Sequence, residues 1–322
     1  MKNRGYSYTD RISPADEGLT IAAFYSSRYP HSTEAEWRRR IEAGQVLLNG
    51  LPASPDDTLT RGDALLYHRL PWDEPAAPTD FGTLFEDDDV LVLAKPSGLP
   101  VLPGGFFLEN TLLHRVRERY GTACSPLHRL GRGTSGAILF TRNHHAARSL
   151  AKAMFERRIL KIYLALASGT AMPDAFMVDA PIGPVPHTLP ATVNAYCPGG
   201  RPSLSHIRVL RRFPGTNASL LEVTIPTGRP HQIRIHLSFA GFPLVGDPLY
   251  LPGGLPRADG FDDDWTTTPG ATGYLLHSWK IRFPHPSRGE EVEIVSPPPA
   301  ALDPGTSSSP FSRSGYRARP PV

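Results

Sequence analysis

The alternation of hydrophobic and polar positions divides the chain into a small N-terminal module and a larger region after it. Residues 18–70 are expected to form the module, because apolar positions recur there first at helical and then at strand spacing. The elements expected in it are a helix over 34–43, with Ser32 or Thr33 as N-cap and Gly44 as its end, a strand over 46–48 that turns at Asn49-Gly50, and a strand over 65–67. Residues 1–17 are polar and expected to be frayed, and three prolines mark residues 71–80 as a linker.

Residues 81–297 show a run of strand patterns interrupted by two helical ones. The strands are expected over 90–94, 137–141, 160–167, 205–210, 220–225 and 279–283, and the helices over 144–158 and 231–240, the second with Pro230 in its first turn and Gly241 at its C-terminal cap. Several strands follow one another without intervening helices, and this order favours an α+β fold over a doubly wound sheet. Residues 298–322 are rich in proline, serine and arginine and are expected to be a disordered tail.

Composition limits the class of protein. Of the 322 residues 40% are hydrophobic, enough for a packed interior, but no apolar run reaches the roughly 18 to 20 residues that a membrane span needs. The first thirty residues lack the apolar stretch of a secretory leader. Cys124 and Cys197 lie far apart in the sequence and are expected to be free thiols in a reducing compartment. These features together predict a cytoplasmic protein that does not span a membrane.

The distribution of charge is more informative than the net charge of +3. Residues 111–163 contain eleven lysines and arginines but only two acidic residues, Glu118 and Glu156. Acidic residues gather elsewhere, as in the run over 86–89. Such segregation of charge indicates a polyanionic partner. Arginine outnumbers lysine, and its guanidinium group can bind phosphate through two hydrogen bonds and stack on bases.

Two segments are dense in groups that could carry chemistry. Residues 128–136 hold two guanidinium groups, an imidazole, two hydroxyls and three glycines directly before an apolar strand. Glycine lets backbone approach a ligand closely, so this segment suits a phosphate or nucleotide, although a structural basic loop explains it equally well. In residues 227–236, the helical spacing puts His231 and Arg234 on one face, where the arginine could hold an anionic substrate. His231 and His236 lie on different faces, so no metal site is expected.

Five segments occur in the order typical of the RluA-type family of pseudouridine synthases, which this chain resembles. They are Lys95-Pro96-Ser97-Gly98-Leu99-Pro100-Val101, the loop His128 to Gly136, the strand Lys161-Ile162-Tyr163-Leu164-Ala165, the run Thr227 to His236 continued by Gly241, Pro243, Gly246-Asp247 and Tyr250, and Leu276-His277-Ser278 with His285-Pro286. The family isomerises chosen uridines in ribosomal or transfer RNA. The resemblance covers residues 81–297, and residues 18–70 resemble more weakly an S-four-like RNA-binding domain.

The resemblance implies a catalytic domain with a mixed, largely antiparallel central sheet and flanking helices. It also implies an RNA partner, no cofactor, no metal and a monomer. By resemblance the catalytic positions are Gly131, Tyr163 and Arg234, and the RNA-binding residues are His128, Arg129, Arg132, Thr134, Ser135, Lys161, Arg229, His231 and Gln232. Tyr163 would be the aromatic on which the flipped uracil stacks; without the resemblance it would be read as an ordinary strand residue.

One departure from the family pattern bears on the reaction itself. The family's catalytic aspartate follows His-Arg-Leu, and here that position is Gly131. No acidic residue occurs between Glu118 and Glu156, so a shift of register cannot supply one. Either another carboxylate serves, with Asp247 and Glu109 as speculative donors, or the chain is an RNA-binding pseudoenzyme; an unrelated hydrolase is the least favoured alternative. Arg234, which pairs with the aspartate in the family, would then be free to bind phosphate, and Gly131→Asp should raise activity.

Overall fold

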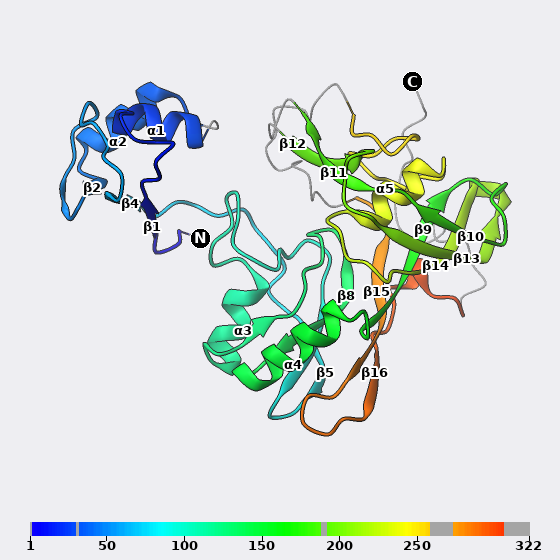
Figure 1. Ribbon diagram of the computed structural model, residues 1–322. Helices are drawn as coiled ribbons and strands as arrows, with labels where there is room; N and C mark the ends of the chain where they lie inside the picture. Colours follow the sequence, from blue (N-terminus) through cyan, green and yellow to red (C-terminus); the bar gives the residue numbers. More distant parts are fainter. Residues whose placement is uncertain (1, 30–31, 188–191, 258–272, 306–322) are drawn as a thin grey trace. The chain divides into compact units, whose positions relative to one another are not determined.

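The computed structural model describes residues 2–29, 32–187, 192–257 and 273–305, and the chain separates into two compact units, Met1–Glu74 and Pro75–Val322 (Figure 1). The first unit is a four-stranded antiparallel sheet in the order β1-β4-β2-β3 with two helices. Its elements are β1 (Tyr6–Arg11), α1 (Ile21–Arg28), α2 (Glu34–Glu42), β2 (Val46–Leu48), β3 (Leu51–Pro52) and β4 (Ala64–Arg69). Thr33 caps α2 in a capping box with Glu36, as the sequence pattern predicts.

The expectation that residues 1–17 are frayed is wrong. Strand β1 pairs with β4 along its whole length, from Tyr6 opposite Arg69 to Arg11 opposite Ala64. Most of its side chains are exposed, which hides the strand from a search for hydrophobic alternation. Its anchors are Asp10, whose side chain pairs with Arg28 at 3.2 Å, and the following Ile12, which is buried in the core of the unit.

The second unit is built on a ten-stranded sheet whose main path runs β10-β13-β14-β9-β15-β8-β6-β5, with β7 beside β8 and β16 beside β15. Its strands are β5 (Gly82–Glu86), β6 (Val90–Lys95), β7 (Ser125–Pro126), β8 (Ser135–Thr141), β9 (Leu160–Ser168), β10 (Ala175–Asp179), β13 (Leu204–Phe213), β14 (Ala218–Thr224), β15 (Leu276–Pro284) and β16 (Glu291–Val295). A separate hairpin pairs β11 (Ile182–Pro186) with β12 (Thr192–Tyr196). The sheet is mixed and largely antiparallel, as expected: only β15 and β8 pair in parallel within the described sheet.

Helices cover both faces of this sheet. They are α3 (Leu112–Tyr120), α4 (His144–Phe155) and α5 (Gln232–Phe239). Strand β6 is buried on both faces: Val90 and Val92 share a core cluster with Leu150 of α4, and Leu91 and Leu93 share another with Leu112 of α3. Its sequence is therefore a continuous apolar run without alternation.

The start of α5 and the C-terminal tail differ from expectation in detail. The first turn of α5 does not contain Pro230, because His231 is the N-cap and takes a left-handed conformation with φ 57°. The expected tail begins with structure: Ala300–Leu302 form a 3₁₀ turn, and Leu302 is buried against the sheet with Leu164 and Leu166. The rest of the tail, 306–322, lies outside the described residues.

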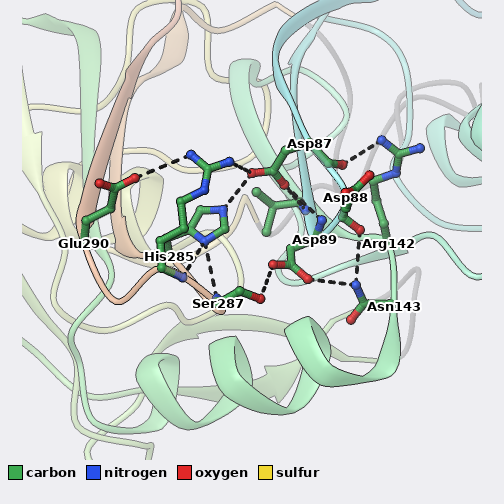
Figure 2. A network of polar contacts seen from close by, with 10 residues as sticks. Asp87, Asp88, Asp89, Arg142, Asn143, His285, Ser287 and Glu290 are labelled. Atoms are coloured by element: carbon green, nitrogen blue, oxygen red, sulfur yellow. Dashed lines mark hydrogen bonds and ion pairs between the residues drawn. The ribbon is translucent and has the colours of Figure 1, made fainter.

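The acidic run at the β5–β6 turn is held by basic residues from distant parts of the second unit (Figure 2). Asp87 Oδ2 accepts hydrogen bonds from His285 Nε2 and Arg288 Nη2, both at 2.7 Å. Asn143 Nδ2 donates to Asp89 Oδ1 at 2.9 Å while its own Oδ1 caps α4. Glu86 and Asp87 of this run are thus paired with Arg142 and Arg288, and His285 of the closing motif ties the end of β15 to the start of the sheet.

Candidate active site

The loop 128–136 is held by hydrogen bonds from the segment 95–101, called here the Lys95 turn. Lys95 is 2% exposed, and its Nζ donates to the carbonyls of Pro96, Leu99 and Arg132 at 2.8, 2.7 and 3.1 Å. Burial lowers the pKa of Lys95 to about 7. Ser97 Oγ adds a hydrogen bond to the carbonyl of Gly133. The first and second family segments thus form one rigid unit, and Lys95 has a structural role in it.

Within the loop, the polar side chains turn to different neighbours. His128 Nε2 accepts from the backbone N–H of Leu139, and burial together with Lys161 lowers the pKa of His128 to about 3. Ser135 Oγ and His277 Nδ1 are hydrogen-bonded at 2.9 Å, which links the loop to β15. Arg129 is exposed and is the loop side chain best placed to meet a polyanion.

Gly136 explains why the loop ends in glycine. Its φ is 106°, and a Cβ there would lie 2.2 Å from the carbonyl oxygen of Ser278. The parallel pairing of β8 with β15 brings the two backbones this close. Any other residue at this position would separate the strands that carry the site.

Tyr163 lies on β9 with its side chain in the central core. It is 6% exposed and shares a cluster with Leu130, Tyr274 and Leu276. Burial raises the pKa of Tyr163 to about 12, with a hydrogen bond from Ser278 acting in the opposite direction. The ring is therefore a neutral, apolar surface beside the active-site loop, which suits stacking on a base.

The expectation that Arg234 lacks an acidic partner is wrong. Its Nε and Nη2 donate to the two carboxylate oxygens of Asp247, each at 2.7 Å, and the two side chains are 2% and 1% exposed. Asp247 also accepts from the backbone N–H groups of Leu249 and Tyr250. Asp247 is thus fully engaged in holding Arg234 and is not free to act as a base. Arg234 Nη1 remains buried without a hydrogen-bond partner among the described residues.

The remaining predicted residues divide into those that hold the fold and those near the loop. Gln232 joins the start of α5 to β13 through its side-chain amide. Its Oε1 accepts from Thr227 Oγ1 and the Arg229 N–H. Its Nε2 donates to the carbonyl of Leu204 and to Ser205 Oγ. Arg229 itself donates to the carbonyl of Pro202.

His231 and Lys161 stay close to the catalytic positions. His231 Nδ1 is hydrogen-bonded to the Tyr250 hydroxyl at 2.8 Å. Burial, with Arg234 as the next cause, lowers the pKa of His231 to about 3. Lys161 is 4% exposed, and burial lowers its pKa to about 8. Its Nζ lies 3.1 Å from where a Cβ at Gly228 would be, so the third and fourth family segments meet here.

Tyr274 is a site residue that the sequence analysis missed. Its hydroxyl lies 2.9 Å from the position of a Cβ at Gly131 and 3.3 Å from Thr134 Oγ1. Its ring lies against the guanidinium group of Arg234, with the carbon atom 4.3 Å from the ring centroid. Tyr274 is two residues before the recognised Leu276-His277-Ser278 segment, and nothing in its local pattern marks it. Only the fold brings it to the loop and to Arg234.

A cavity of about 730 Å³ opens beside this group and is lined by residues of the loop, the Lys95 turn and β15, among them Ser97, Gly133, Ser135, Tyr274 and His277. Across the described parts of the chain, no cluster of three or more histidine, cysteine or acidic side chains is placed to hold a metal ion. None of the described helices is long and apolar enough to cross a bilayer. Cys124 and Cys197 are both free thiols.

Comparison with known proteins agrees with this geometry. Residues 89–239 match the family described as RNA pseudouridylate synthase. The chain is 38% identical to RNA pseudouridine synthase 5 of Oryza sativa subsp. japonica, over 93% of this chain and 88% of that protein. It is 32% identical to the ribosomal large subunit pseudouridine synthase D of Neisseria meningitidis, over 84% and 72%.

Solved structures give the same answer for the fold. The human RNA Pseudouridylate Synthase Domain Containing 1 superposes with a TM-score of 0.54 at 27% identity, over 72% of this chain and 89% of that one. Together with the ordered segments and the grouping of Gly131, Tyr163 and Arg234, these matches identify the family. The chain belongs to the RluA-type RNA pseudouridine synthases.

Proposed function

We propose that the protein is a catalytically active synthase that converts uridine to pseudouridine in structured RNA of the ribosomal or transfer type. The observation that carries the proposal is the buried guanidinium group of Arg234. Its Nε and Nη2 are fixed by Asp247, while its Nη1 has no hydrogen-bond partner in the part of the chain that the structure describes. A buried polar atom without a partner is costly, and it is tolerated where a ligand or reacting group completes its bonding. Leu130 of the loop 128–136 and Tyr163 share a core cluster with Tyr274, against whose ring the Arg234 guanidinium group lies.

The reaction needs base flipping and a change of glycosidic bond. The target uridine leaves the stack at a cost of a few kcal/mol, which stacking on Tyr163 offsets by about 1 to 3 kcal/mol. The bond from C1′ to N1 then breaks, the uracil turns, and C5 forms the new bond to C1′. The hydrogen of C5 leaves, and N1 gains one, so the product is an isomer of the substrate and no cofactor is consumed.

Tritium release tests the proposal. The substrate is RNA labelled with tritium at C5 of uridine, from a strain that lacks the protein. We expect the purified chain to release tritium to water from this RNA, because each turnover removes the C5 hydrogen. Labelled RNA from the parent strain is the matched control, since its target uridines are already converted. No release from either RNA would favour the pseudoenzyme, for which the missing carboxylate at Gly131 is the argument.

We expect RNA affinity to fall steeply with salt, because the basic stretch 111–163 displaces counterions from phosphates. Arg148 is exposed on α4 within this stretch. Arg148→Gln should reduce the slope of log affinity against log salt by about 0.7 to 0.9, the value of one phosphate contact. Arg282→Gln is the control, because Arg282 is half-exposed and paired with Glu293 outside the stretch. Equal slopes for the wild type and both variants would contradict this interface.

A further inference from the structure

The phenol of Tyr274 occupies the space that a carboxylate at position 131 would fill. Its oxygen lies 2.9 Å from the Cβ position of Gly131, somewhat farther than the carboxylate oxygens of an aspartate lie from their own Cβ. We propose that Tyr274 is the catalytic nucleophile of this protein and replaces the missing aspartate. The inference rests on the proposed synthase function and deepens it, because it names the group that acts on the ribose.

The contacts of Tyr274 place its oxygen between the loop and the arginine. The hydroxyl is hydrogen-bonded to Thr134 Oγ1 at 3.3 Å. The ring is fixed against Arg234, whose guanidinium carbon lies 4.3 Å from the ring centroid. Tyr274 is 3% exposed and is one of the residues that line the cavity of about 730 Å³, whose described lining does not include Gly131, Tyr163 or Arg234. A hydroxyl partner is usual for a buried tyrosine, so the feature that singles out Tyr274 is the position of its oxygen beside Gly131.

Two guanidinium groups lie near Tyr274. Burial lowers the pKa of Arg132, and the nearby Tyr274 opposes that shift. For Arg234, burial acts to lower the pKa, but Asp247 and then Tyr274 raise it above its ordinary value. Two guanidinium groups are therefore close enough to interact electrostatically with the phenol. Arg234 Nη1, which is buried and unpaired among the described residues, is available to the charge that develops in the reaction.

The proposed reaction balances in atoms and electrons without another reagent. As Tyr274 Oη forms a bond to C1′, the C1′–N1 bond breaks with its electron pair going to N1, and the phenol proton moves to N1. The uracil turns, C5 attacks C1′, and the pair of the C1′–O bond returns to the phenol oxygen. That oxygen then takes the C5 proton, which exchanges with water. Tyrosine serves as the nucleophile in sialidases, so a phenol can perform this type of substitution at a sugar.

Tyr274→Phe tests the role of the hydroxyl. We expect the single-turnover rate of tritium release to fall by about 100-fold or more, the size expected for loss of a reacting group, with RNA affinity unchanged. Tyr120→Phe is the matched control, because it also removes one hydroxyl with one hydrogen bond, to Thr83, at the far end of α3. A Tyr274→Phe rate equal to wild type overturns the inference and leaves the synthase function standing; no release by the wild type overturns both.

A second measurement separates catalysis from packing. Replacing Tyr274 by 3,5-difluorotyrosine keeps the ring and hydroxyl but makes the phenol more acidic. We expect the pH–rate curve to shift to lower pH, which a merely structural tyrosine would not cause. An unshifted curve overturns the inference even if Tyr274→Phe fails to fold.

A double substitution at positions 131 and 274 should restore part of the activity that Tyr274→Phe removes. A Cβ at position 131 sits 2.9 Å from the Tyr274 hydroxyl, so Gly131→Asp alone is crowded. Removing that hydroxyl makes room for the carboxylate. We expect Gly131→Asp/Tyr274→Phe to release tritium faster than Tyr274→Phe, and equal rates would contradict a shared catalytic position.

Discussion

Asp247→Asn should lower the free energy of unfolding by about 3–5 kcal/mol, the cost of leaving one member of a buried ion pair without its partner. Asp247 and Arg234 are 1% and 2% exposed, and both carboxylate oxygens accept from the guanidinium group. An asparagine keeps the shape but turns an N–H group toward the guanidinium donors. Because both side chains are almost fully buried, bulk water compensates the remaining charge poorly.

The control is the same change at an exposed pair. Asp174 accepts from Arg212 Nη1 at the same 2.7 Å, but its side chain is 88% exposed. Asp174→Asn should cost about 0 to 1 kcal/mol, as is usual for surface pairs. Urea titrations followed by circular dichroism measure both. Similar losses for the two variants would mean that the buried pair adds nothing beyond a surface contact.

The second large effect is a decrease in the free energy of unfolding as the pH falls. It should begin at a higher pH than the one at which carboxylates titrate. His128 and His231 have their pKa lowered to about 3 by burial, whereas an unfolded imidazole has a pKa of about 6.5. Between these values the unfolded chain binds protons that the folded chain excludes. The stability they contribute is therefore complete above pH 6.5 and falls as the pH decreases toward 3, by about 1.4 kcal/mol per pH unit for each imidazole.

Single substitutions test which histidines cause this dependence of the unfolding free energy on pH. His128→Gln keeps an acceptor for the Leu139 N–H and should remove one proton from the dependence of unfolding free energy on pH between 6.5 and 4. His231→Asn should do the same, because asparagine tolerates the left-handed backbone found there, φ 57°. His145→Gln, at the exposed start of α4, is the control for the substitution itself. A wild-type slope in all three variants would contradict the prediction.

The elements that the sequence predicted well carry their own signals. Helix α2 begins at a Thr33 capping box and ends just before Gly44. The short apolar runs of β6 and β8 are typical of buried strands. The elements that were missed lack such signals. Helix α3 buries only Leu112 and Val116 among basic residues, and β1 is mostly exposed.

The site divides in the same way. Tyr163 and Arg234 could be named because they stand inside recognisable segments. Asp247 also stands in a recognised segment, but its role as the partner of Arg234 could not be predicted, because the pairing depends on a loop of irregular structure after α5. Tyr274 could not be named either, since it reaches Gly131 only through the pairing of β15 with β8, across more than a hundred residues of sequence.

The place of β15 in the sheet also determines when the site can exist during synthesis. Strand β15 lies between β9 and β8 (Figure 1), and among the described strands it alone connects these two. A nascent chain that stops before Leu276 can build β5, β6 and β8 as one sheet, and β9, β14, β13 and β10 as another. The Gly131 loop belongs to the first and Tyr163 to the second. Long-range pairing of this kind is slow, so we expect the Gly131 loop and Tyr163 to come together in a late step of folding, after β15 has been synthesised.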